Sequence, residues 1–229
     1  MPSLKRSVMN AQKYAFFDFD NTLSKGDSIV PFLLYCVCHR YASVSHLFRT
    51  VGAWIRHRFH HADDFIHVKE TTFSFLKGMR KEEIDHICID FVERVLSKRI
   101  FPEGVSEIER LRSNGYVTYI VSASCELYMN HIDRIIPVDH ILSTECIFSD
   151  DTYTGKMGIN CKGEEKRRRI KEALGMIPNP KNCVCYGDSP SDAAMLELGC
   201  KQFLINPHSK ALPKKFPNVE IKKWKVKRK

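Results

Sequence analysis

The chain has 229 residues, which is long enough for one domain with a large insertion or for two small domains, and for a sizeable hydrophobic core. Hydrophobic residues make up 43% and charged residues 28%, a balance that excludes a disordered, fibrous or multi-spanning membrane protein. The formal net charge is +9, and most of it lies in residues 214–229, where eight lysines and arginines face the single acid Glu220.

We interpret this basic C-terminal tail as a solvated chain end; the alternative is a segment that attaches to an anionic membrane or to nucleic acid. Nine cysteines are an odd, scattered set, which favours free thiols and a cytoplasmic location over a disulfide framework. No apolar segment of signal-peptide length is visible near the N-terminus. The apolar stretch Ile29–Cys38 is shorter than the roughly 20 residues that a membrane span needs. It predicts a buried helix or, alternatively, an interfacial one.

The first element in the chain is a predicted buried strand that starts at Tyr14 and runs into a polar loop at Asp18, Asp20, Asn21 and Thr22. Residues 28–100 contain no strand-like alternation. Apolar residues recur there at helical spacing and predict a bundle of about four helices. The helical apolar positions include Val44, Leu47, Phe48, Val51, Phe65, Val68 and Thr72.

Histidines 57, 60 and 61 lie in the same helical region, beside Arg56 and Arg58. We interpret these histidines as a solvated or phosphate-attracting face rather than as a metal cluster.

From Pro102 onward, helices and strands alternate, which is typical of a parallel sheet covered on both faces. After a first helix that ends at Gly115, we predict strands at 116–122, 139–142, 183–186 and 201–205, helices at 127–135, 164–174 and 191–198, and a small hairpin at 153–155. The fold class is therefore α/β, a Rossmann-like parallel sheet with a helical-bundle cap inserted after its first strand. The expected units are an N-terminal extension (1–13), an α/β catalytic core (14–27 and 101–229) and the cap domain (28–100).

Three predicted strand ends are unusually polar: Asp18-Phe-Asp-Asn-Thr, Ser122-Ala-Ser and Gly187-Asp-Ser-Pro-Ser-Asp192. Ligands of doubly wound sheets collect at the carboxyl ends of the strands. Buried carboxylates without partners are costly, so packing is a poor explanation for these clusters. The residues Asp18, Asp20 and Asp188 predict a site of oxygen ligands, which suits Mg²⁺. The alternative for Asp188 and Asp192 is capping of the helix that follows, and for Ser122 a strand end.

The segment Phe17-Asp-Phe-Asp-Asn-Thr-Leu23 resembles the Asp-x-Asp-x-Thr signature of the haloacid dehalogenase-like superfamily. Ser122 resembles its second motif and Gly187–Asp192 its fourth. The helical insertion and Asn160–Lys166 resemble the phosphoserine-phosphatase-like branch, and the motifs stand in the family's order.

The resemblance implies a nucleophile at Asp18 and an acid/base at Asp20. It implies Mg²⁺ held by Asp18, the backbone carbonyl of Asp20 and Asp188, with Asp192 and Ser189 in support. It further implies phosphate or substrate contacts for Thr22, Ser122, Ala123 and Asp27.

The motif lysine is either Lys162 or Lys166, which are four residues apart and share one helical face. We slightly favour Lys166 because no strand or helix fixes Lys162. Asp27 stands where phosphoserine phosphatases place a Glu that faces the substrate amine, and no cap arginine matches their carboxylate-binding residue. Capping of the following helix is the other interpretation of Asp27.

We therefore predict a cytoplasmic, Mg²⁺-dependent phosphatase that hydrolyses a small phosphorylated metabolite through an aspartyl-phosphate intermediate, and the difference at Asp27 argues against phosphoserine as that metabolite. One alternative is a phosphatase for lipid head groups, whose tail and Ile29–Cys38 helix rest weakly on a membrane surface. Another is a non-catalytic module that binds through its basic tail. Nucleic acid is not an expected partner of the favoured enzyme, and the sequence leaves the oligomeric state open.

Overall fold

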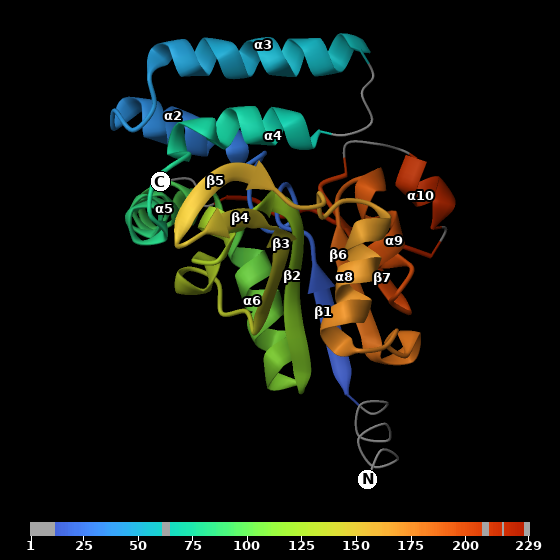
Figure 1. Cartoon of the computed structure of the whole chain (residues 1–229). Coiled ribbons are helices and arrows are strands. Elements are labelled where there is room, and N and C mark those ends of the chain that lie inside the picture. The colour runs from blue at the N-terminus through green and yellow to red at the C-terminus, as the bar shows by residue number, and fades with distance from the viewer. Residues whose placement is uncertain (1–11, 61–64, 208–210, 217, 227–229) are drawn as a thin grey trace.

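The computed structural model describes residues 12–60, 65–207, 211–216 and 218–226 (Figure 1). The predicted N-terminal extension lies outside the described residues except for Gln12 and Lys13, and so does His61. A six-stranded parallel sheet has the strand order β3-β2-β1-β6-β7-β8. Its strands are β1 (Lys13–Phe17), β2 (Tyr116–Cys125), β3 (His140–Thr144), β6 (Cys183–Gly187), β7 (Lys201–Ile205) and β8 (Glu220–Lys222).

Helices cover both faces of this sheet, because successive strand residues point to opposite sides. Ala15 and Phe17 of β1 pack with α6 in one apolar cluster, whereas Tyr14 and Phe16 pack with α8 and α9 in another. The predicted α/β fold is therefore confirmed. The helices of this core are α6 (Pro102–Ser113), α7 (Glu126–Met129), α8 (Glu164–Leu174), α9 (Ala193–Leu196) and α10 (Ala211–Lys215).

Between β1 and α6 the chain forms helices that stand over the carboxyl ends of the strands (Figure 1). They are α2 (Ile29–Cys38), α3 (Val44–His60), α4 (Ile66–Phe73) and α5 (Lys81–Arg94), with 3₁₀ turns at Ser74–Leu76 and Leu96–Arg99. Phe32, Phe73 and Phe91 of this cap share one apolar cluster with Phe17 of the sheet. The cap is thus packed onto the core. Among the described residues, no helix has the length and apolar character needed to cross a bilayer.

Three predicted elements differ from the structure. The helix expected at 127–135 is α7 followed by a 3₁₀ turn at Ile132–Arg134, and the helix expected at 191–198 is a 3₁₀ turn at Pro190–Asp192 followed by α9. In the second case the Asp192 carboxylate accepts bonds from the Ser189 backbone and side chain, which fixes a tight turn before the helix. The hairpin of β4 (Cys146–Ser149) and β5 (Thr152–Met157) turns at Asp150 and Asp151, both at positive φ, and not at 153–155.

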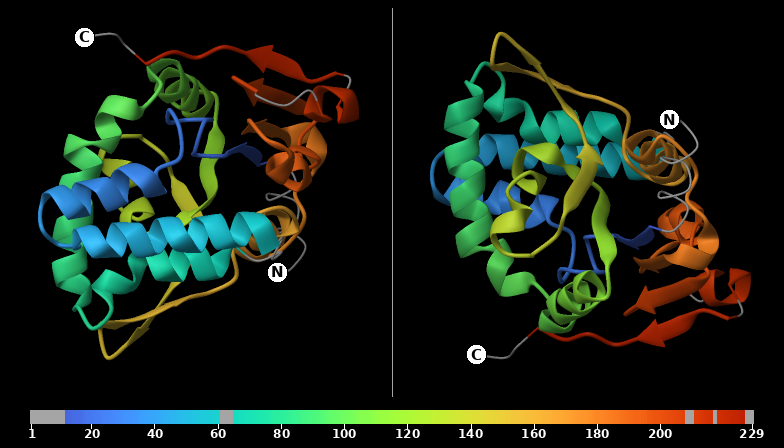
Figure 2. Two further views of the ribbon diagram at one scale, coloured as in Figure 1. Left: turned by 90° about the horizontal axis from the view of Figure 1, so that it is seen from above. Right: turned by 90° about the horizontal axis from the view of Figure 1, so that it is seen from below.

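The largest correction concerns the basic tail, whose described part is folded and not a solvated end. Strand β8 extends the sheet beside β7, and Trp224 is 7% exposed. The Asn206 side chain bonds the backbone N and O of Trp224, and Figure 2 shows this segment running beside α6. A Cβ at Gly104 would lie 2.9 Å from the Trp224 ring, so this glycine of α6 allows the close approach. The apolar residues between the lysines hold the tail in place.

We expect Trp224→Ala to lower the free energy of unfolding by about 3 kcal/mol, because the substitution leaves a cavity against Gly104 and Tyr186. Urea denaturation of both proteins measures the difference. Lys223→Ala, which removes an exposed neighbour in the same segment, should stay within about 0.5 kcal/mol of the wild type. Equal, small effects of both changes would contradict the folded tail.

Candidate active site

The residues that follow β1 and β6 and those in the last part of β2 meet in a pocket of about 220 Å³ beneath the cap. This placement follows from the parallel sheet, whose carboxyl strand ends share one edge. Lys69 of α4 and Phe65, which directly precedes that helix, cover the pocket, and the loop before α8 closes one side. Its lining includes Asp18, Asp20, Asp27, Ser122, Ala123, Lys162, Lys166, Asp188 and Ser189.

Asp18 follows β1 directly and forms a buried ion pair with Lys166 of α8. The Lys166 Nζ donates to Asp18 Oδ1 at 2.5 Å and to Asp192 Oδ1 at 2.7 Å, and the lysine side chain is 1% exposed. Although burial opposes it, the contact with the two carboxylates holds the pKa of Lys166 above its usual value. Lys166 is therefore charged and bridges the first and fourth motifs.

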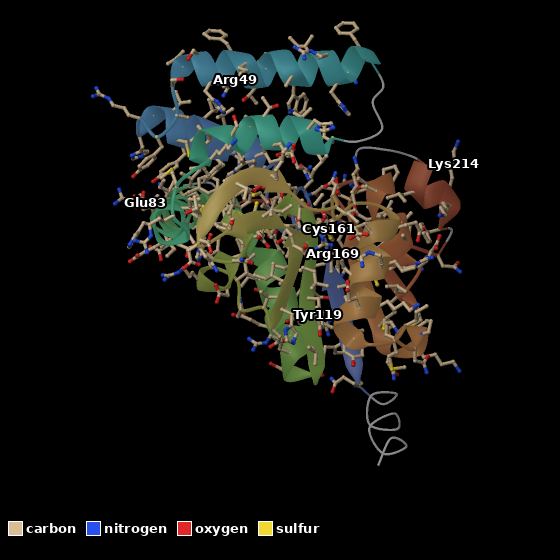
Figure 3. The ribbon with its side chains drawn as sticks, in the orientation of Figure 1. Arg49, Glu83, Tyr119, Cys161, Arg169 and Lys214 are labelled. Carbon is tan, nitrogen blue, oxygen red and sulfur yellow. The ribbon has the colours of Figure 1, made fainter. Side chains whose placement is uncertain are left out.

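Of the two candidate lysines, the structure brings Lys166 to Asp18. Lys162 lines the pocket but is exposed at its edge. The slight preference for Lys166 thus agrees with the geometry. Its neighbour Arg169, labelled in Figure 3, is buried one turn later and bonds the backbone carbonyls of Ser143 and Ile159. It fixes α8 against the loop that carries Lys162.

Carboxylates crowd this end of the pocket. Ligand atoms of Asp18, Asp188 and Asp192 all lie within 4.8 Å of one another. Burial and the neighbouring carboxylates raise the pKa of Asp188 to about 8 and that of Asp18 to about 6. One lysine does not balance three buried acids, so the donor set fits a hard divalent cation such as Mg²⁺. Asp192 stands beside the expected ligands and also accepts the backbone N–H groups of Asp188 and Ser189.

Asp20 turns its carboxylate away from this cluster. Its Oδ1 accepts the backbone N–H of Ser28 at 2.9 Å, and its Oδ2 accepts the hydroxyls of Ser28 and Ser124. Burial and the nearby Asp27 raise its pKa to about 7. A carboxyl group that titrates near neutral pH can both give and take a proton, as an acid/base residue must.

The predicted phosphate-binding residues divide into two groups. Ser122 is buried in the pocket wall, where its Oγ accepts the Ser124 N–H at 3.0 Å, and Ala123 lines the pocket beside it. Thr22 does not line the pocket. Its side chain is fully buried, and its Oγ1 has no hydrogen-bond partner among the described residues. The structure therefore does not bring Thr22 to the pocket, because its side chain is directed into the protein after β1, and a substrate contact by Thr22 stays a prediction.

The position of Asp27 is compatible with both of its interpretations, helix capping and substrate contact. Its Oδ1 accepts the Ile29 N–H at 2.8 Å and so caps the start of α2, and its exposed side chain also lines the pocket.

The sequence analysis missed Lys69, a buried cap residue that reaches into the site. Its side chain is 3% exposed, and its Nζ donates to the carbonyl of Ala123 and to Asn160 Oδ1, both at 2.5 Å. Burial lowers its pKa to about 8. The sequence contained one signal for this role. Lys69 stands four residues after Phe65 and three before Thr72, which places a lysine on the apolar face of α4.

A family model described as haloacid dehalogenase-like hydrolase matches residues 15–197. A "Probable phosphatase" of Mycobacterium tuberculosis is 25% identical over 202 residues, which cover 86% of this chain and 70% of the relative. A phosphoserine phosphatase of Methanocaldococcus jannaschii is 26% identical over 192 residues, covering 81% and 82% of the two chains.

Solved structures show the same fold. A Bordetella pertussis protein of unknown function has a TM-score of 0.80 at 20% identity, covering 92% of this chain and 97% of that one. A phosphoserine phosphatase with a phospho-aspartyl intermediate analogue has a TM-score of 0.60 at 21% identity, covering 94% and 95%. With the motifs in order around one pocket and a family model over most of its length, this chain belongs to the haloacid dehalogenase-like hydrolases, in their phosphoserine-phosphatase-like branch of phosphatases.

Proposed function

We propose that this protein is a Mg²⁺-dependent phosphatase that hydrolyses a small phosphomonoester through an aspartyl-phosphate on Asp18. The observation that carries the proposal is the buried bridge of Lys166 between Asp18 and Asp192, with Asp188 beside it and Asp20 across the pocket. A nucleophilic carboxylate, a separate acid/base and a cluster of charges around the transferred group are the parts that phosphoryl transfer requires.

In the first half of the reaction, a carboxylate oxygen of Asp18 attacks phosphorus and the ester oxygen leaves. Lys166 binds Oδ1, so we assign the attack to Oδ2. Asp20, protonated at its raised pKa, gives its proton to the departing alkoxide. The bonds from Ser28 and Ser124 hold its carboxyl group in place for that transfer.

In the second half, water attacks the aspartyl-phosphate and Asp20 takes the proton that water gives up. The phosphorus–oxygen bond to Asp18 breaks, and inorganic phosphate leaves with Asp18 restored. Ser122 and the Lys166 ammonium neutralise charge on the phosphoryl oxygens. When bound by Asp18, Asp188 and the carbonyl of Asp20, with Asp192 and Ser189 in support, Mg²⁺ supplies further charge neutralisation of the phosphoryl group.

The pocket favours a small leaving group. Its volume of about 220 Å³ has to accommodate the phosphoryl group as well. On the cap side, Asp27 offers an anion, Lys69 a cation, and Ile29 and Phe65 apolar surface. We propose a small phosphorylated metabolite as substrate. Asp27 and Lys69 are the residues that would select among leaving groups.

Phosphate release from a panel of phosphomonoesters, with and without Mg²⁺, tests this function. The panel contains phosphoserine, histidinol phosphate and a lipid phosphate. We expect turnover of at least one small ester that disappears with EDTA and returns with Mg²⁺. Metal-independent turnover, or no turnover of any ester, would contradict the proposal.

The cap lysine provides a second test. We expect Lys69→Met to lower kcat/KM by roughly ten- to a hundredfold, because the variant loses the bonds from α4 to Ala123 and Asn160 that close the cap over the pocket. The matched control is Lys98→Met, an exposed lysine of the cap, which should leave kcat/KM unchanged. Steady-state kinetics on the preferred ester measure both. If Lys69→Met matches the control, Lys69 has no part in closing the site.

A cytoplasmic location is part of the proposal, supported by nine free cysteines, of which seven are buried. The alternative of a binding module that acts through its tail has less support, because β8 and Trp224 are part of the fold. Of the surfaces named for a membrane-resting phosphatase, α2 is mostly inside the cap: Ile29, Phe32, Leu33, Tyr35 and Cys36 are buried.

A further inference from the structure

Helix α3 carries its large apolar side chains on the side that faces solvent. Phe48 and Phe59 are 70% and 77% exposed, and Val44, Val51 and Ile55 are between 46% and 58% exposed. Their spacing of four, three, four and four residues places them in one row along the helix, which we call the outer stripe. In Figure 1, α3 is the outermost helix of the cap, with α2 and α4 between it and the sheet.

The inner side of α3 is more polar, although Leu47 packs there against the hydrophobic core. His46 and Thr50 are buried there, His57 is half-buried, and the His46 ring bonds the carbonyl of Thr72 on α4. Arg49, labelled in Figure 3, also bonds inward, to Ser74. A surface helix of a globular protein normally packs its apolar stripe inward. The helical apolar positions Val44, Phe48 and Val51, predicted to form the bundle's core, are thus exposed, and a partner has to cover them.

Charge identifies the kind of partner. Helix α3 contains three arginines and three histidines and no acidic residue. Arg56 and Arg58, both exposed, flank the outer stripe on its two sides. A second copy of the same helix would bring arginine against arginine, which is unfavourable. An apolar row between basic flanks is the pattern of a helix that lies in the interface of an anionic membrane.

We propose that α3 is an interfacial helix that attaches this protein to anionic lipid bilayers through the outer stripe. Phe48, Ile55 and Phe59 insert among the acyl chains, and Arg56 and Arg58 contact lipid phosphates. The attachment is independent of the reaction at Asp18. It gives the site beneath α4 access to phosphomonoesters at a membrane surface, since Phe65 at the start of α4 packs against Trp54 and His57 of α3.

Co-sedimentation with vesicles tests the attachment. We expect the full chain to bind phosphatidylcholine vesicles that contain roughly a third of phosphatidylglycerol, and to bind pure phosphatidylcholine vesicles much less. The double variant Phe48→Ser/Ile55→Ser should lose roughly tenfold or more in vesicle affinity, because both side chains leave water on binding. Arg56→Gln/Arg58→Gln should bind weakly and lose most of the wild type's sensitivity to salt.

Two controls separate this proposal from a folding defect and from the proposed function. Ile147→Ser/Ile177→Ser removes two exposed isoleucines that lie outside the cap. This variant should bind vesicles like the wild type. Asp18→Asn should also bind like the wild type, whatever its activity. Phe48→Ser/Ile55→Ser should hydrolyse a water-soluble ester at the wild-type rate if it folds.

Three results would overturn the attachment. One is a wild type that ignores anionic vesicles, and another is an Ile147→Ser/Ile177→Ser variant that loses binding as much as the α3 variant. The third is a concentration-dependent dimer, seen by sedimentation and abolished by Phe48→Ser/Ile55→Ser, which would assign the outer stripe to a second copy of this chain.

Discussion

Asp18→Asn should lower the rate of phosphate release by roughly 10⁴-fold or more, because an amide neither attacks phosphorus nor forms the acyl phosphate. The affinity for the substrate should fall much less than the rate, since Lys166, Ser122 and Asp188 remain in the pocket. We therefore expect the loss in kcat with little change in substrate affinity. Single-turnover kinetics and equilibrium binding of the preferred ester measure the two quantities separately.

The Asp18→Asn variant also tests how the fold tolerates its buried charges. The substitution removes one of three crowded acids, so we expect the free energy of unfolding without metal to stay the same or to rise. Residual activity above roughly one percent of the wild type would mean that another group is the nucleophile.

Lys166→Met should have the second largest effect. It should lower both the free energy of unfolding and the catalytic rate. The variant leaves Asp18 and Asp192 buried without their shared cation, and breaking a buried ion pair costs about 3–5 kcal/mol. Neutralising the acids restores part of this loss, so the deficit should shrink as pH falls and the carboxylates gain protons. Denaturant melts at two pH values measure it.

Lys162→Met is the matched control for this prediction, since that lysine lines the same pocket but is exposed. It should unfold like the wild type and keep most of its activity. If Lys162→Met lost activity while Lys166→Met kept it, the motif lysine would be the other candidate, and the buried bridge would be structural only.

The sequence predicted the sheet, the helices on its faces and the meeting of Asp18, Asp20 and Asp188, because these follow from local patterns. Strand alternation and helical spacing are read within about ten residues. A parallel sheet then brings the polar strand ends to one edge, whatever the details of packing.

Lys69 could not be placed in the same way, because its role depends on how α4 packs over β2, a contact between residues far apart in the sequence. The prediction of a solvated tail was wrong for a related reason. Its charge dominates the composition, while the burial of Trp224 depends on a gap at Gly104 of α6. On α3 the helical period was correct, but a period does not tell which side of a helix faces the protein.

The most direct test of the central claim is a rapid-quench search for phosphate bound covalently to Asp18, made with an ester that has a good leaving group, with Mg²⁺ and with the variant Asp20→Asn. Without its acid/base, the second half-reaction should slow more than the first for an ester with a good leaving group. We predict an acid-stable, hydroxylamine-sensitive phosphoryl group on the peptide that contains Asp18. Turnover of the ester with no phosphorylated Asp18 at any time point would contradict the account.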